Sequence, residues 1–288
     1  MHITEIVPDV LKSLEEQNEH PNTITGFKTG FVDLDKITGG FQPGELIVIA
    51  SRPSIGTTAF AQSIIANRLD DPESNPSFLI VCPDFSKEIY TKRLLIMLSE
   101  VDSSRIRKGE LTSTDFERLS LAADTLNQSS INIIDKQRVS REEIRRTAGE
   151  LKGENGLDLI LIDSLLMLRF EEENQNLKSD LDQSVQTLKN LAGEFEVPIV
   201  AVASLNRRVE RRQDQRPMLS DLKGSDCIED VADKVLLLYR GMAFDAKAID
   251  PEDSELFIVK NNCGPTGFVR LQFVGKYPRF FKYCVTPR

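Results

Sequence analysis

The sequence predicts an α/β fold with a mostly parallel central sheet, helices on both faces and an antiparallel C-terminal extension. Six short apolar runs have the composition of buried strands, and longer segments with helical spacing separate most of them. After the sixth run the pattern changes to three strand-like segments joined by short turns. A chain of 288 residues suits one large domain of this class with a small extension.

Each element has its own signal in the sequence. The six apolar runs lie at 45–50, 77–82, 131–135, 157–163, 197–203 and 234–240. Continuous apolar character, in place of alternation, indicates strands that are covered on both faces. Residues 59–69 and 181–195 have helical patterns typical of the connections between parallel strands. The three C-terminal strands are expected at 255–262, 267–275 and 279–285.

Residues 1–24 are predicted to form a separate linker helix, and residues 25–288 the main domain. Apolar residues recur at helical spacing at Ile6, Val10, Leu11 and Leu14. So short a helix cannot bury its apolar side alone, so we expect it to dock on another surface such as a neighbouring subunit. The alternative interpretation is a frayed tail.

The composition excludes several classes of function. The net charge of −9 argues against wrapping duplex DNA with the whole surface. There is no apolar run of the ~20 residues that a membrane span needs, and no signal-peptide pattern, so a cytoplasmic protein is expected. The four cysteines lack metal-ligand spacing. The arginine-rich segment 205–216 is either a solvated loop or an anion-binding patch.

The segment SRPSIGTTAF at 51–60 has nearly the spacing of a phosphate-binding loop, and it stands between a predicted strand and a predicted helix. Backbone N–H groups of such a turn bind phosphate, and Gly56 permits a close approach. Thr58 offers a hydroxyl to Mg²⁺, but Thr57 stands where the loop lysine belongs. The candidate nucleotide-binding residues are Ser51, Arg52, Pro53, Ser54, Ile55, Gly56, Thr57 and Thr58.

Asp163 is the second candidate for the same site. It ends the apolar run LDLILID, and a buried strand that delivers a carboxylate to the open end of the sheet suits a Mg²⁺–nucleotide complex. We therefore assign Thr58 and Asp163 as Mg²⁺ ligands. The alternative for Asp163 is a residue that caps the strand.

The chain from about residue 25 to 284 resembles the motor domain of the DnaB-type replicative DNA helicases. The resemblance lies in TGFKTGFVDLDKITGGFQPGELIVIASRPSIGTTAFA, LILIDSLLML, LNRRVERRQDQRPMLSDL, IEDVADKVLLLYR and VKNNCGPTGFVRLQF. It implies a RecA-like P-loop NTPase fold, ATP and Mg²⁺ as cofactors, and hexameric rings around single-stranded DNA. It also implies that the N-terminal helix is the family's linker helix, while the family's primase-facing domain has no counterpart in these residues.

Carried over residue by residue, the resemblance shows changes at the catalytic positions. Thr57 replaces the loop lysine, which stabilises charge in phosphoryl transfer. Asp84 stands where the family has the glutamate that activates water, and its side chain is one methylene shorter. A misplacement on the order of 1 Å can cost ~10²-fold in rate.

The sensor pair and the trans-acting residues have changed too. Ala203 and Ser204 stand where the family has Ser-Gln at the end of its fourth core strand. Before the Gly-Pro turn the trans-acting lysine is present as Lys260, but Asn262 replaces the arginine finger. A missing finger is worth ~10³–10⁵ in rate.

The DNA-facing positions give a mixed signal. The resemblance suggests Arg207, Arg208 and Lys223 as DNA-binding residues. The acidic residues at 171–173 lie in a loop where the family carries Arg and Asn, and Asp226 adds a negative charge to a second loop that usually reads Arg-Glu-Ser-Gly-Ser. Carboxylates repel phosphate.

Three hypotheses follow from these observations. The first is a degenerate DnaB-like domain with impaired or lost ATP hydrolysis, which assembles into or regulates a helicase ring. The second is an active ATP-dependent 5′–3′ helicase in which Arg52 or Lys260 supplies the missing charge. The third is a single-stranded DNA-binding module without catalysis.

Overall fold

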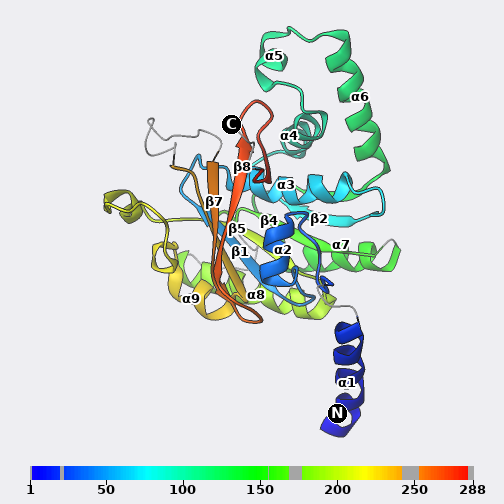
Figure 1. The fold of residues 1–288 in the computed structure, drawn as a ribbon, viewed down its shortest axis with the longest axis vertical. Helices are drawn as coiled ribbons and strands as arrows, with labels where there is room; N and C mark the ends of the chain where they lie inside the picture. The colour runs from blue at the N-terminus through cyan, green and yellow to red at the C-terminus, as the bar shows by residue number, and fades with distance from the viewer. Residues whose placement is uncertain (1, 20–22, 155, 169–176, 242–252, 285–288) are drawn as a thin grey trace.

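The computed structural model describes all residues except 1, 20–22, 155, 169–176, 242–252 and 285–288. Within the described residues nine strands form a single sheet in the order β3-β2-β4-β5-β1-β6-β7-β8-β9 (Figure 1). The six strands from β3 to β6 pair in parallel, and the last three pair antiparallel. The structure therefore confirms the predicted α/β class with its antiparallel extension.

The parallel strands lie within a few residues of the predicted runs. They are β1 (Leu46–Ser51), β2 (Ser77–Val81), β3 (Ser130–Ile134), β4 (Leu159–Asp163), β5 (Ile199–Ser204) and β6 (Lys234–Tyr239). Nearly every residue of the five strands inside this group is buried, whereas β3 at the edge is mostly half-exposed. Continuous apolar sequence was therefore the correct signal for strands covered on both faces.

The extension consists of β7 (Asp253–Asn261), β8 (Gly267–Val274) and β9 (Arg279–Lys282). Burial alternates along β7 and most of β8, because these strands have one face toward the core. The last strand packs against helix α3, where the Phe280 amide donates to Ser63 Oγ across 2.9 Å. This contact closes the extension over the helix that follows the phosphate loop.

Helices cover both faces of the sheet, as expected. One face carries α2 (Val32–Thr38), α3 (Thr57–Leu69) and α4 (Lys87–Ser99), and the other carries α7 (Arg141–Glu154), α8 (Leu177–Phe195) and α9 (Ser225–Val231). Alternate residues of β1 point to opposite faces, so Ile47 and Val48 belong to two different apolar clusters. Helices α5 (Ser103–Lys108) and α6 (Ser113–Gln128) extend the fold beyond α4 (Figure 1).

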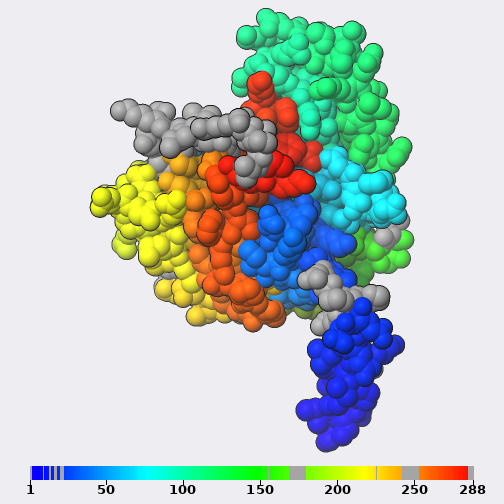
Figure 2. Space-filling view, viewed as in Figure 1, coloured from blue at the N-terminus to red at the C-terminus, as the bar shows by residue number. Residues whose placement is uncertain are grey.

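The expected N-terminal helix is present as α1 (Ile3–Glu19), which projects away from the domain (Figures 1 and 2). Its predicted apolar stripe is uncovered within this chain: Ile6, Val10, Leu11 and Leu14 are 41–55% exposed. The domain boundary after residue 24 stays a prediction. No helix in the described part of the chain has the length and apolar character needed to cross a membrane.

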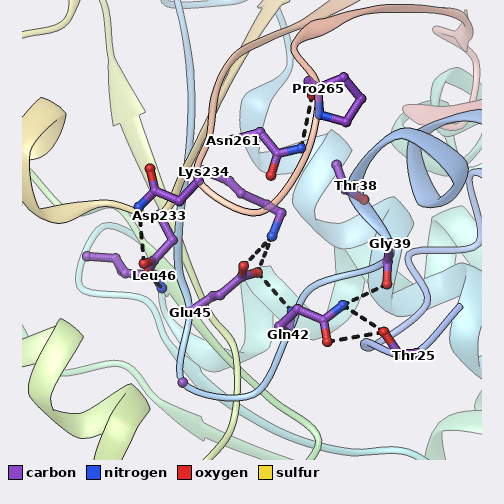
Figure 3. A network of polar contacts seen from close by, with 12 residues as sticks. Thr25, Thr38, Gly39, Gln42, Glu45, Leu46, Asp233, Lys234, Asn261 and Pro265 are labelled. Carbon is purple, nitrogen blue, oxygen red and sulfur yellow. Dashed lines mark hydrogen bonds and ion pairs between the residues drawn. The ribbon is translucent and has the colours of Figure 1, made fainter. Parts of the chain in front are cut away.

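A buried ion pair joins the chain ahead of β1 to the start of β6 (Figure 3). Lys234 is fully buried, and its ammonium contacts both carboxylate oxygens of Glu45. Glu45 also accepts the Gln42 amide across 2.8 Å, and the Leu46 amide donates to Asp233 across 2.8 Å. This network fixes the amino ends of β1 and β6, opposite the end where the phosphate loop begins.

Candidate nucleotide-binding site

The segment between β1 and α3 has the backbone of a phosphate-binding loop. Gly56 precedes α3 with φ +112°, a conformation that L side chains rarely adopt. A Cβ at this position would lie 3.3 Å from a ring carbon of Phe280. The loop therefore requires glycine here for both its conformation and its space, and its amides open the helix whose dipole favours anions.

The hydroxyl of Thr57 is used inside the loop. Ser51 Oγ donates to the Arg52 carbonyl across 2.8 Å, and Thr57 Oγ1 contacts the same Ser51 oxygen. Because the Ser51 proton is already committed, Thr57 is the donor in this contact. The residue at the lysine position thus stabilises the loop, but it brings no positive charge to a phosphate.

Thr58 and Asp163 come together, as the sequence predicted. Thr58 Oγ1 donates to Asp163 Oδ1 across 3.2 Å, joining the first turn of α3 to the end of β4. Asp163 is 1% exposed, and its Oδ2 is buried without a hydrogen-bond partner in the structure. Burial raises the pKa of Asp163 to about 6; the Thr58 hydrogen bond and Arg93 lower it, and Asp84 raises it.

These two residues fit a magnesium ion. A buried carboxylate oxygen that lacks a partner is costly unless a cation or donor satisfies it. Mg²⁺ characteristically takes one or two protein oxygens and completes its shell with waters and nucleotide phosphates. The described residues contain no cluster of three or more metal-ligating His, Cys, Asp or Glu side chains, so a site of this sparse kind fits better than a protein-built cage.

Asp84 lies beside the same carboxylate. It follows β2, and its Oδ2 accepts a hydrogen bond from Ser164 Oγ across 3.2 Å. Partial burial raises the pKa of Asp84, and the Ser164 bond lowers it. Asp84 also lines a cavity of about 400 Å³ with Arg138 and Met167. The role of Asp84 as a base stays a prediction.

Arg52 is directed to other partners than a phosphate. Its guanidinium forms an ion pair with Glu210 at 2.6 Å and donates to the Leu205 carbonyl across 2.8 Å. The side chain is largely buried in this arrangement. Arg52 therefore connects the loop to the segment after β5, and this arrangement does not support its expected role as a substitute for the lysine.

The sequence reasoning missed Arg240, which also holds the phosphate loop. Arg240 donates to the Ile55 carbonyl across 3.1 Å, and its guanidinium lies 3.8 Å from the centre of the Phe273 ring. Burial lowers its pKa. No local motif in the sequence marks Arg240. It reaches the loop because β6 pairs with β1, and the order of strands along the chain does not reveal this pairing.

Lys260 and Asn262 lie at the end of the sheet opposite the phosphate loop of the same chain. Lys260 pairs with Val235 near the start of β6, and its ammonium donates to the Glu229 carbonyl across 2.5 Å. The Asn262 amide donates to the Asp233 carbonyl across 3.0 Å. Since β1 spans ~20 Å between the two ends, neither side chain reaches the loop of the same chain. Any role of Lys260 in phosphate binding therefore requires a second subunit.

The three DNA-binding candidates lie on two adjacent segments. Arg207 and Arg208 are exposed in the short helix η1 (Arg207–Arg211), and Lys223 is exposed beyond η2 (Leu219–Asp221). A bridge between residues 205 and 222 brings the two segments together. Two other arginines of the basic stretch form ion pairs with acidic residues, which reduces its free charge. The acidic run at 171–173 lies outside the described residues.

The phosphate loop after β1, the carboxylate at the end of β4 and the observed strand order define the RecA-like class of P-loop NTPase domain. Residues 26–282 match the model of the DnaB-like helicase C-terminal domain, and the chain belongs to that family.

Curated relatives support the family at the level of sequence. The chain is 35% identical to the replicative DNA helicase DnaC of Bacillus subtilis (strain 168), over 97% of this chain and 61% of that protein. It is also 35% identical to the replicative DNA helicase DnaB of Geobacillus stearothermophilus, with the same coverage. The chain thus spans about three fifths of the length of these relatives.

Solved structures agree with this assignment. The ATPase domain of G40P superimposes with a TM-score of 0.89 at 32% identity, covering 96% of this chain and 98% of that domain. A DnaB-like replicative helicase, studied with its interactions with primase, superimposes with a TM-score of 0.87 at 32% identity, covering 96% of this chain and 66% of that one.

Proposed function

We propose that this chain acts in DNA replication as a DnaB-like motor domain that binds Mg²⁺–ATP and hydrolyses it poorly or not at all. Its work is then assembly or regulation of a helicase ring, either as a homo-hexamer or beside another helicase subunit. The observation that carries the proposal is the contrast between two adjacent residues. Thr58 keeps its contact with Asp163, whereas Thr57 turns to Ser51 and supplies no charge.

The groups proposed for nucleotide binding are present except for the loop lysine. Loop amides and the start of α3 would hold the phosphates, while Thr58 and Asp163, which are hydrogen-bonded to each other, would hold the metal. When bound, Mg²⁺ neutralises part of the negative charge on the phosphates. These residues orient the nucleotide without a charged side chain at position 57.

The hydrolytic half is deficient in three ways. The charge at position 57 is absent, the carboxylate at Asp84 is one methylene shorter than the family's glutamate, and Asn262 replaces the finger. Each of these groups acts on charge or water in the transition state, so their loss lowers the rate more than it lowers the affinity. Single-stranded DNA binding through Arg207, Arg208 and Lys223 is a further part of the proposal.

A pair of neighbouring threonine variants tests this function. Thr58→Val removes the hydroxyl that faces Asp163, and Thr57→Val removes the one that faces Ser51. We expect Thr58→Val to abolish the Mg²⁺ dependence of ATP binding in equilibrium titrations, while Thr57→Val retains it. Steady-state hydrolysis is measured on the same samples, with and without single-stranded DNA.

The outcomes separate the hypotheses. Binding by the unmodified protein with little turnover supports the proposed role. DNA-stimulated turnover of ordinary helicase magnitude contradicts it and favours the active helicase. Tight, steeply salt-dependent DNA binding without any ATP binding favours the non-catalytic DNA-binding module.

A further inference from the structure

The phosphate loop opens onto a cavity of about 400 Å³ whose far walls carry two arginines. Gly56 and Thr58 line it on the loop side, Arg93 on α4 and Arg107 on α5. A volume of this size is within the range of small-ligand sites. Arg93 and Arg107 are distant from the loop in sequence. The fold places both in the cavity next to the loop that would bind a phosphate.

We propose that Arg93 supplies, from within the same chain, the positive charge for nucleotide phosphates that the loop lacks at position 57. The inference rests on the proposed binding of Mg²⁺–ATP. It assigns the residue that replaces the missing loop charge in that binding.

Arg93 has charge to give to a ligand. Among the described residues no carboxylate forms an ion pair with it, and its guanidinium instead lies 4.0 Å from the centre of the Phe85 ring. A cation–π contact with a ring does not use the guanidinium N–H donors, so these stay available for a phosphate.

The other candidate cations are less suited to this role. Arg52 is paired with Glu210, and Arg240 donates to a loop carbonyl. Lys260 lies at the far end of the sheet on the Glu229 carbonyl. Arg107 lines the cavity but is exposed at the end of a short helix, so we assign it a secondary role.

The helix that carries Arg93 is well anchored. Ser86 caps α4, and Tyr90 and Leu94 on either side of Arg93 are buried against the sheet. The backbone position of Arg93 is therefore set before a nucleotide binds, which lowers the entropic cost of the contact. Lys92, its neighbour on the exposed side of α4, is the matched control because it carries the same charge away from the cavity.

The test is equilibrium titration of Mg²⁺–ATP and of AMP into the unmodified protein and three variants, Arg93→Gln, Arg93→Lys and Lys92→Gln. A charged hydrogen bond of this type corresponds to about a 10- to 100-fold change in affinity. We expect Arg93→Gln to weaken ATP binding by that factor and AMP binding much less, since AMP lacks the β- and γ-phosphates. Arg93→Lys should recover part of the loss, and Lys92→Gln should stay within twofold of the unmodified protein.

Salt dependence gives a second measurement. Affinity for ATP should fall less steeply with ionic strength in Arg93→Gln than in Lys92→Gln, because one screened charge contact is gone. Equal affinities of Arg93→Gln and the unmodified protein would overturn the role of Arg93 and leave the proposed function standing. Equal losses for ATP and AMP would also overturn it, since they indicate a distorted cavity. If the unmodified protein binds no ATP, both proposals fail.

Discussion

A hydrogen bond of 3.2 Å between Thr58 and Asp163 joins the start of α3 to the end of β4. In the sheet, β4 lies two strands away from β1, the strand that precedes the phosphate loop. The bond uses one oxygen of Asp163 and leaves the other buried and without a partner in the structure. A buried carboxylate oxygen without a partner lowers the stability of the nucleotide-free protein and is well suited to bind a cation. We therefore expect Asp163 to influence both the affinity for a cation and the pH dependence of stability.

Asp163→Asn should stabilise the protein when neither metal nor nucleotide is present. Burial raises the pKa of Asp163 from its ordinary value of 3.8 to about 6, so the folded state binds this proton more tightly than the unfolded chain. Its favourable contribution is complete below pH 3.8 and is lost as the pH rises through about 6. Above that pH we expect the variant to be more stable by about 2–3 kcal/mol.

Urea unfolding at pH 4 and pH 7.5, in buffer with a chelator, checks this expectation. The gain should appear at pH 7.5 and nearly vanish at pH 4. Asp124→Asn is the control, because Asp124 is exposed on α6 and its substitution should change stability little at either pH. A stability difference for Asp163→Asn that does not vary with pH would show that the buried charge is not its cause.

Thr57→Lys alone should tighten ATP binding without restoring turnover. A lysine here adds a charged phosphate contact worth ~1.5–3 kcal/mol, and the loop backbone already has the required form. The variant still has Asn262 in place of the arginine finger, and such a finger is worth a factor of ~10³–10⁵ in the rate of hydrolysis. We therefore expect steady-state hydrolysis to rise less than about tenfold.

The matched comparison adds Asp84→Glu and Asn262→Arg to the same variant. This triple variant should hydrolyse ATP far faster than Thr57→Lys alone, provided that rings form. A large recovery from Thr57→Lys by itself would show that a single change disabled the site.

The order of elements could be predicted from the sequence because apolar runs and helical spacing are local properties. The run at 157–163 ends at Asp163, and β4 ends at the same residue. The pairing order β4-β5-β1-β6 is not local, since it depends on which strand surfaces pack together across more than a hundred residues. That order decides which side chains surround the loop.

The residues of the candidate site likewise fall into those that local motifs reveal and those that only tertiary packing places. Gly56, Thr58 and Asp163 were accessible to motif reasoning because their roles depend on spacing within one strand and one turn. Arg93 and Arg240 were not, because tertiary packing alone places Arg93 in the cavity beside the loop and brings Arg240, just after β6, to the loop carbonyl. The ion pair of Arg52 was not accessible for a related reason, since its partner Glu210 is 158 residues away along the chain.

Deletion of residues 1–20 should abolish oligomers. The apolar stripe of α1 is uncovered in the single chain, and a short helix of this kind gains stability only by docking on another surface. Val10→Asp with Leu11→Asp should reproduce the effect of the deletion, whereas Glu15→Gln on the same helix should not. Light scattering gives the mass of each variant, and an unchanged mass for the deletion would reject the linker role.

Glu45→Gln should lower the free energy of unfolding by about 3 kcal/mol, because it leaves the Lys234 charge buried without its counter-charge. Replacing both residues, with Glu45→Leu and Lys234→Met, should cost less than Glu45→Gln alone, since no uncompensated charge remains. Urea unfolding of the three proteins measures the difference. The pair lies beside Asp233, which holds Asn262 through its carbonyl, so ring assembly by the double variant shows whether the network also positions this edge for a neighbour. A double variant less stable than Glu45→Gln would contradict the assignment of the cost to the unpaired lysine.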